Sequence, residues 1–346
     1  MPKRKNLIRP SSITMQDVAK LAGVSQSTVS RVLSKVPSVV PISEDTVQKV
    51  LDAVDRLGYY PNLAARSLRN QKTNLVAIMI ADLTNPFYHS IIHAVQDIAR
   101  QRHHDVLIAS TDHRYEYEKA FCEAMMRRPV DGIVMVPFHL TEEDIDTLIN
   151  RTGAQIVALA KHINHPQVDT VFVDDGRATY DVVTWLVRQK GHRRVGFIGV
   201  AQSHPPGLRR WQAYIQAMEA AGLPVNPDYI QEGDWSVESG QSAMKMLLEL
   251  PDPPTAVYVC NDLMAIGALD TAHDMGRSIP GDVAVVGFDN IPAATLIRPK
   301  LTTIAQPAGE LGRTLSEFLF DRIEGKETGP RRVVEIPSQL IERNST

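Results

Sequence analysis

Short aliphatic runs alternate with amphipathic stretches through most of this chain after residue 74. Runs such as LVAIMI, GIVMVP and AVYVC have the length of strands, and segments with apolar residues at helical spacing separate them. Unbroken aliphatic strands that alternate with helices are typical of parallel sheets covered on both faces. Two such series follow one another, so the sequence predicts an α/β fold with two doubly wound parallel-sheet lobes.

The stretch TMQDVAKLAGVSQSTVSRVL predicts two short helices joined by a tight turn. Thr14 can cap the first helix, because Asp17 stands at the reciprocal position of a capping box. Val18, Leu21 and Ala22 would form its apolar face. Gly23 would end this helix, and Ser25 can cap a second helix over residues 26–33, whose exposed side carries hydroxyls and one arginine.

A third helix and a basic surround make this hairpin a candidate DNA-binding module. Ser43 can cap a helix that Gly58 would end. Residues 1–72 hold twelve Lys and Arg against five Asp and Glu, a balance of plus seven, so the rest carries minus ten of the total of minus three. A basic end on an acidic body is expected where that end meets a polyanion. Without this setting, an ordinary helical hairpin with a solvated face would explain the pattern equally well.

The segment YYPNLAARSLRNQKTN predicts a two-turn helix over residues 63–69, with Asn62 as its cap. So short a helix is marginal in water and needs a partner, either DNA or the same helix of a second subunit. Leu68 stands between Arg66 and Arg69. It is either a dimer contact or a wedge that enters the minor groove and kinks the duplex.

Polar and aromatic residues stand directly after many of the predicted strands. Open parallel sheets bind ligands beyond the carboxyl ends of their strands, and aromatic faces beside charged groups suit a polar ring. Each such residue, taken alone, is more often a helix cap or a loop residue, but their recurrence predicts a cleft. The candidate effector-binding residues are Asp82, Phe87, Tyr88, Lys161, Arg210, Trp235, Asn261, Asp289 and Gln306.

Other kinds of chemistry lack their motifs in this sequence. His89 and His93 have no zinc-protease glutamate between them, and neither a P-loop nor a GxSxG elbow occurs. Cys122 and Cys260 are the only cysteines, which fits free thiols in a reducing compartment. No apolar run could span a bilayer and no export signal is evident. We therefore expect a cytoplasmic protein without enzyme activity, metal or cofactor.

ITMQDVAKLAGVSQSTVSRVL followed by GYYPNLAARSL resembles the head and hinge of the lactose-repressor family of bacterial transcription regulators. The resemblance covers essentially the whole chain, since the body is similar to the two-lobed sugar-binding fold of periplasmic binding proteins. It implies effector contacts at Arg210, Asn261, Asp289 and Gln306, and aromatic contacts at Trp235 and at Phe87 or Tyr88. One departure is Ala160 and Lys161, where many members carry Asp or Asp-Arg. With the resemblance, the predicted DNA-binding residues are Thr14, Ser25, Gln26, Ser27, Thr28, Ser30, Arg31, Asn62, Arg66 and Leu68, of which Gln26, Ser27 and Arg31 read bases.

These observations predict a homodimeric repressor that reads a pseudo-palindromic operator in double-stranded DNA and responds to a small polar effector, with a sugar as the leading candidate. A solute-binding protein of a sugar transport system is the alternative, and a sugar-modifying enzyme a distant third. The predicted domains are a helix-turn-helix head at 1–61, a hinge helix and linker at 62–73, a first lobe at 74–174 plus about 305–326, and a second lobe at 175–304 plus about 327–346.

Overall fold

The computed structural model describes residues 13–34, 42–60 and 72–346, and the chain divides into two compact units between Thr73 and Asn74. The smaller unit contains α1, α2 and α3. The predicted hinge helix, with Asn62, Arg66 and Leu68, lies outside the described residues. The bounds of the three helices are Met15–Ala22 for α1, Gln26–Ser34 for α2 and Glu44–Leu57 for α3.

Side-chain caps begin these helices where the sequence predicts them. The Oγ1 atom of Thr14 accepts a hydrogen bond from the backbone N–H of Asp17, and the Asp17 carboxylate accepts one from the backbone of Thr14, which completes the capping box. Ser25 accepts from the backbone N–H of Thr28 at 3.1 Å. Gly23 ends α1 in the left-handed region, with φ of 67°.

The three helices enclose a small core. Val18, Val29 and Val50 are fully buried in it, so the apolar stripes predicted for these helices meet one another. The prediction that Leu21 belongs to the apolar face of α1 is wrong, because its side chain is 49% exposed. Val18 and its neighbour Ala19 make the buried side of α1, and Leu21 lies outside that contact.

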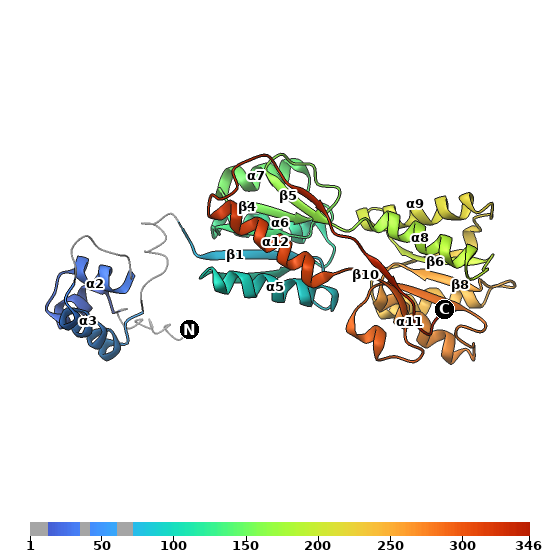
Figure 1. Cartoon of the computed structure of the whole chain (residues 1–346), viewed down its shortest axis with the longest axis horizontal. Helices are drawn as coiled ribbons and strands as arrows, with labels where there is room; N and C mark the ends of the chain where they lie inside the picture. Colours follow the sequence, from blue (N-terminus) through green and yellow to red (C-terminus); the bar gives the residue numbers. More distant parts are fainter. Residues whose placement is uncertain (1–12, 35–41, 61–71) are drawn as a thin grey trace, which may run out of the picture. The chain divides into compact units, whose positions relative to one another are not determined.

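The larger unit contains two six-stranded sheets, each with its own helices, which we call the first and second lobes (Figure 1). All strands of the first sheet are parallel, in the order β11-β5-β4-β3-β1-β2. Its strands are β1 Leu75–Ile80, β2 Asp105–Ser110, β3 Gly132–Met135, β4 Gln155–Leu159, β5 Val168–Phe172 and β11 Val333–Glu335, and its helices are α5 Phe87–Gln101, α6 Tyr115–Arg127, α7 Glu142–Thr152 and α12 Ala308–Ile323.

The second sheet has the order β12-β10-β9-β8-β6-β7, with only β12 antiparallel. Helices α8 and α9 pack together, as do α10 and α11. The strands are β6 Val195–Val200, β7 Ile230–Gly233, β8 Ala256–Val259, β9 Ala284–Asp289, β10 Thr302–Ala305 and β12 Gln339–Ile341; the helices are α8 Asp175–Arg188, α9 Pro205–Ala220, α10 Val237–Leu248 and α11 Asp262–Asp274, with short 3-10 helices η1 Pro227–Tyr229 and η2 Pro292–Thr295.

Strand β1 shows why the aliphatic runs are unbroken. Val76 and Ile78 belong to the hydrophobic cluster that includes residues of α5 and α12, whereas Ala77 and Met79 belong to the cluster with α6 and α7. Since successive strand residues point to opposite faces, a strand covered on both faces needs apolar residues at every position. The edge strand β2 differs from this expectation, because Ile108 on it is 37% exposed.

The chain passes between the lobes three times, after β5, after β10 and between β11 and β12. Figure 1 shows α12 across the first lobe, although it follows β10 of the second. The predicted return to the second lobe at about residue 327 is wrong, because β11 pairs with β5 in the first sheet and only β12 pairs with β10.

A buried ion cluster holds β11 in the first lobe. The Asp169 carboxylate on β5 accepts hydrogen bonds from the guanidinium groups of Arg322 on α12 and Arg332 just before β11, at distances of 2.7 to 3.1 Å. Burial opposes the charge on Asp169, but the hydrogen bonds from both arginines outweigh it and lower the pKa of this carboxyl. These partners are distant in sequence, so no local sequence pattern predicts that β11 pairs with β5.

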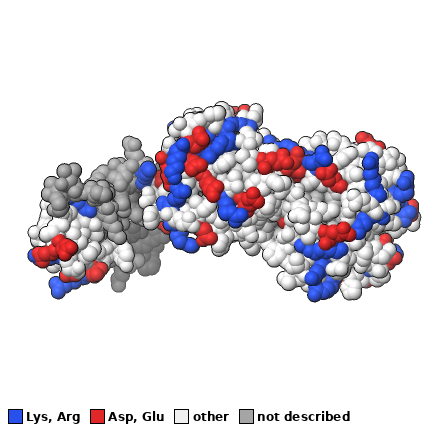
Figure 2. All heavy atoms as spheres, viewed as in Figure 1, with Lys and Arg blue, Asp and Glu red and all other residues white. Residues whose placement is uncertain are grey.

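Charged side chains of both signs cover the larger unit. On the face that Figure 2 shows, Lys and Arg are interspersed with Asp and Glu over both lobes. This mixture suits a solvated surface and offers no extended basic field to a polyanion there. None of the helices that the structure describes is both long and apolar enough to cross a membrane.

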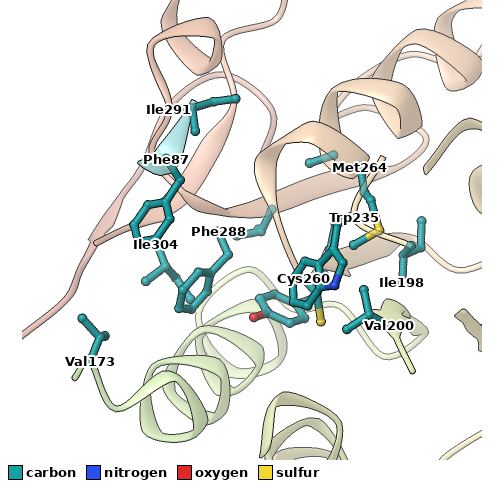
Figure 3. Packing of buried hydrophobic residues seen from close by; sticks show 14 of the residues in the cluster. Phe87, Val173, Ile198, Val200, Trp235, Cys260, Met264, Phe288, Ile291 and Ile304 are labelled. Atoms are coloured by element: carbon teal, nitrogen blue, oxygen red, sulfur yellow. The ribbon is translucent and has the colours of Figure 1, made fainter. Parts of the chain in front are cut away.

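One hydrophobic cluster extends through both lobes. It contains Phe87 and Val173 of the first lobe together with Trp235, Phe288 and Ile304 of the second (Figure 3). The lobes therefore share apolar contacts beside the ends of their strands.

Candidate effector site and DNA-binding face

A cavity lies between the carboxyl ends of the two sheets. It encloses about 720 Å³ of empty space, its open mouth included. Phe87 and Tyr88 at the start of α5 line it from the first lobe, and Arg210 on α9 lines it from the second. The predicted effector-binding residues that line the cavity are Phe87, Tyr88, Lys161, Arg210, Trp235, Asp289 and Gln306.

Arg210 is the buried cation of this site, with only 5% of its surface exposed. Its Nη1 atom donates to the carbonyl oxygen of Cys260, and its guanidinium carbon lies 3.7 Å from the centre of the Phe288 ring. The Nε atom is buried and has no hydrogen-bond partner among the described residues, with Asp175 Oδ2 3.5 Å away. A buried guanidinium is costly unless its donors are paired, and this one leaves its Nε unpaired on a residue that lines the cavity.

Asp289 is the matching buried acid, at the end of β9. Burial raises its pKa to about 7, although the charge of Arg210 and a hydrogen bond from Gln306 Nε2, 2.7 Å from Asp289 Oδ1, both act to lower the pKa. Asp289 has φ of 115°, so its backbone adopts a conformation that few non-glycine residues adopt. The side chain is thus held in the cavity by a constrained backbone and by Gln306.

Two ion pairs lie along the cavity wall. Lys161 Nζ donates to Asp174 Oδ2 at 2.6 Å, and Arg209 donates to both oxygens of the Asp175 carboxylate, at 2.6 and 3.0 Å. Lys161 therefore already has a carboxylate partner. Burial, and then the charge of Arg209, lower the pKa of the neighbouring His162 to about 4.

Two of the predicted effector residues, Asp82 and Asn261, do not line the cavity. Asp82 accepts hydrogen bonds from the backbone and hydroxyl of Thr84 and stabilises a turn. Asn261 is buried as the N-cap of α11 and donates to the backbone of Trp235. Residues directly after strands can cap the next helix or turn instead of facing the cleft, and here they do.

The exposed side of α2 is the candidate DNA-binding face. Gln26, Ser27 and Arg31 are exposed there, while Thr28 and Ser30 are half-buried. Thr14 and Ser25 serve as helix caps, so their hydroxyls also have a structural role.

Two sequence families match this chain. A profile described as bacterial regulatory proteins of the lacI family matches residues 14–62, and one described as a periplasmic binding protein-like domain matches residues 186–346. Catabolite control protein A of Priestia megaterium is 34% identical over 336 residues, which are 97% of this chain and 99% of that protein. The chain belongs to the lacI family. It is a DNA-binding transcriptional regulator.

Further lacI-family relatives agree over the full length. The repressor CytR of Escherichia coli (strain K12) is 34% identical over 341 residues, 97% of each chain. The solved structure of the lac repressor dimer bound to operator and the anti-inducer ONPF superposes with a TM-score of 0.82, at 25% identity over 97% of this chain and 99% of that one. A complex of the regulator CelR with cellobiose has a TM-score of 0.71, at 29% identity over 98% of this chain and 100% of that one. These relatives are regulators, so the transport alternative is not supported.

Several residues that line the cavity of this lacI-family protein were not predicted from its sequence. Phe138 follows the run GIVMVP and Asp175 follows VFVD, so the strand-end rule could have found both. His113 and His162 also stand three residues after a strand, β2 and β4, so the same rule could have found them. The further lining residues are Asn85, Val136, Pro137, Leu159, Ala160, Phe172, Val173, Pro206 and Arg209. The described residues include no group of three His, Cys, Asp or Glu placed to hold a metal ion.

Proposed function

We propose that this lacI-family regulator is a homodimeric repressor whose operator affinity changes when a sugar, or a polar ring of similar size, binds between its lobes. The observation that carries the proposal is the cavity between the carboxyl ends of the two sheets, with Arg210 and Asp289 buried in it. A guanidinium and a carboxyl offer charge-assisted hydrogen bonds to ring hydroxyls, and Trp235 and Phe87 offer apolar faces. The cellobiose complex of CelR supports a sugar as the class.

The effector acts by favouring one arrangement of the lobes over another. A change of operator affinity by about 100-fold needs about 2.7 kcal/mol of differential binding, which is within the usual range of allosteric coupling. We propose that lobe closure changes the separation of the two hinge segments of a dimer. Operator binding with and without the effector decides between induction and co-repression.

The head is proposed to read DNA in the major groove through α2. Arginine and glutamine can form bidentate hydrogen bonds with base edges, and serine can reach bases or phosphates. Gln26, Ser27 and Arg31 are exposed on one helix, which supports this role. We propose that Leu68 enters the minor groove at the centre of a two-fold symmetric operator. Because such a regulator acts on the chromosome, we place it in the cytoplasm.

The homodimer is proposed to use the face formed by β2 and α6. Strand β2 is an edge of the first sheet, and an exposed edge with apolar side chains is a ready surface for another chain. Tyr117 on α6 is 43% exposed and lines a groove together with Leu107, Phe121 and Met125. Ile108, on the opposite face of the same edge strand, is 37% exposed. The solved lac repressor structure is also described as a dimer, which supports this assembly.

A ligand screen tests the effector part of the proposal. The full chain is heated with each member of a panel of mono- and disaccharides and nucleosides, and the melting temperature is recorded. A ligand at about 100 times its Kd stabilises the folded protein by about 2.7 kcal/mol. The stabilisation should disappear in Arg210→Gln and persist in Arg277→Gln, which changes an exposed arginine. A ligand that stabilises all three proteins equally would place its site elsewhere.

A further inference from the structure

Aromatic side chains from both lobes meet in one cluster beside the cavity. His113, in the loop after β2, comes from the first lobe, and His204 before α9 and Trp235 after β7 come from the second. The His113 ring stacks on Trp235 with ring centres 5.5 Å apart and planes 15° apart, and on His204 at 5.7 Å and 24°. These contacts cross the cleft, so they exist only while the lobes are together.

Two further residues of the first lobe complete the cluster. Phe138 meets His204 edge to face at 5.4 Å and Trp235 at 6.3 Å, and His139 meets His204 at 5.3 Å. His139 Nε2 donates to the backbone carbonyl oxygen of His113 at 2.9 Å, which holds the His113 loop. Both Asp112 and His113 have positive φ values, 49° and 55°, so this loop has a defined conformation that presents the ring to the second lobe.

The hydrogen bonds of the cluster require a neutral His204. The Nε1–H of Trp235 donates to Nδ1 of His204 at 3.2 Å, so Nδ1 must carry a lone pair and the ring proton must be on Nε2. A protonated imidazole has no lone pair on either nitrogen and could not accept this bond. Two charged imidazoles stacked as His113 and His204 are would also repel each other.

The surroundings of the two histidines act in the same direction. Burial lowers the pKa of His113 to about 4, although the carboxylates of Asp82, Asp112 and Asp234 around it raise the pKa and His139 lowers it. Burial also lowers the pKa of His204 to about 4, assisted by His113 and His139. In the closed cluster the imidazoles of His113 and His204 therefore stay neutral at mildly acidic pH. In separated lobes the same imidazoles would be protonated near the ordinary pKa of 6.5.

We propose that His113 and His204, stacked with Trp235 across the cleft, form a latch that holds the lobes together only while both imidazoles are neutral. Acidification then shifts the lobes toward the open state. Each histidine should change the ratio of closed to open protein by about tenfold between about pH 7.5 and about pH 5.5, and both by about a hundredfold. The effect of this latch on operator binding rests on the proposed function, whereas the latch itself concerns only the lobes.

A distance measurement between the lobes tests the latch without effector or DNA. Spin labels are attached to the full chain through Glu143→Cys on α7 and Glu219→Cys on α9, which are exposed positions on different lobes, whereas the native cysteines are buried. The labelled chain is diluted with unlabelled chain, and pulsed electron spin resonance records the interlobe distances. We expect one short distance at about pH 7.5 and a growing longer population at about pH 5.5.

Two variants assign that change to the latch. The double variant His113→Gln and His204→Gln cannot gain these protons, and a glutamine oxygen can still accept from Trp235, so its distances should change with pH much less than those of the wild type. His93→Gln changes an exposed histidine of α5 and should keep the wild-type response. Circular dichroism checks that each protein stays folded across this pH range. The latch would be overturned if the wild-type distances stayed constant over the range. It would also be overturned if the double variant showed the same pH response as the wild type. Either result leaves the ligand screen above unaffected.

Discussion

Asn261 donates a hydrogen bond from Nδ2 to the carbonyl oxygen of Trp235, at 2.9 Å. Its Oδ1 atom accepts from the backbone N–H of Met264 at 2.9 Å and caps α11. Trp235 has φ of 75°, a conformation that costs a tryptophan free energy unless its surroundings stabilise it. The relationship therefore makes Asn261 a positioning residue for the tryptophan that lines the cavity.

Asn261→Asp should separate the two functions of this side chain. The carboxylate keeps the oxygen that caps α11 but loses the amide donor to Trp235, so we expect effector binding to weaken by about tenfold, as for the loss of about 1.4 kcal/mol. Calorimetric titration with the effector from the screen measures this loss. Asn261→Ala removes both bonds and should also lower the free energy of unfolding. Full affinity in Asn261→Asp would contradict the positioning role.

Asp289→Asn should change how stability depends on pH. The pKa of Asp289 is about 7 in the folded protein and has an ordinary value of 3.8, so the folded state binds an extra proton between these values. Because the unfolded state ionises first, the free energy of unfolding falls progressively as the pH rises through this window. Relative to wild type, the asparagine variant should gain about 2 to 4 kcal/mol on going from about pH 4 to about pH 8. Urea unfolding at several pH values measures the difference, and parallel curves would contradict the raised pKa.

Arg31→Ala should lower operator affinity and relax sequence preference. The loss of a bidentate base contact costs about 1 to 3 kcal/mol and removes discrimination at one position of each half-site. Selection of bound sequences from random duplex DNA measures both quantities. Lys20→Ala on α1 is the control, since this lysine lies outside α2 and its loss should leave the sequence preference unchanged. An unchanged preference in Arg31→Ala would remove this residue from base reading.

Ile108→Lys should dissociate the proposed dimer. The new ammonium group would be buried without a partner against the edge strand of a second subunit, at a cost of several kcal/mol. Analytical ultracentrifugation of the full chain should show monomers at concentrations where wild type is dimeric. Met246→Lys changes an apolar side chain that is 47% exposed on the second lobe, and should leave the dimer intact. Dimers in both variants would place the interface elsewhere.

The caps and strands could be predicted because their causes are local. Thr14 and Asp17 are three residues apart, and so are Ser25 and Thr28. The capping hydrogen bonds that begin α1 and α2 can therefore be predicted from the sequence. The alternation of aliphatic runs likewise reports the two covered faces of each strand. The position of Asp289 followed from one general rule about strand ends, whereas Arg210 stands on α9, ten residues after the end of β6.

Contacts between distant segments could not be predicted in this way. Strand β11 is three residues long and half exposed, and its place beside β5 depends on Asp169 meeting Arg332. Residues directly after strands are also ambiguous, since Asn261 turns to cap α11 while Asp289 faces the cavity. The difference depends on the backbone direction after each strand.

The sequence by itself determined the kind of molecule, because periodicity, capping residues and the head motif each act within a few residues along the chain. The tertiary structure decided which side chains share a cleft. His113 and His204 are 91 positions apart in the sequence, and their stacking depends on how two sheets face each other. The partial burial of those rings, and the burial of Arg210 with Asp289, depend on many long-range contacts at once, so their chemistry emerges only when the chain is folded.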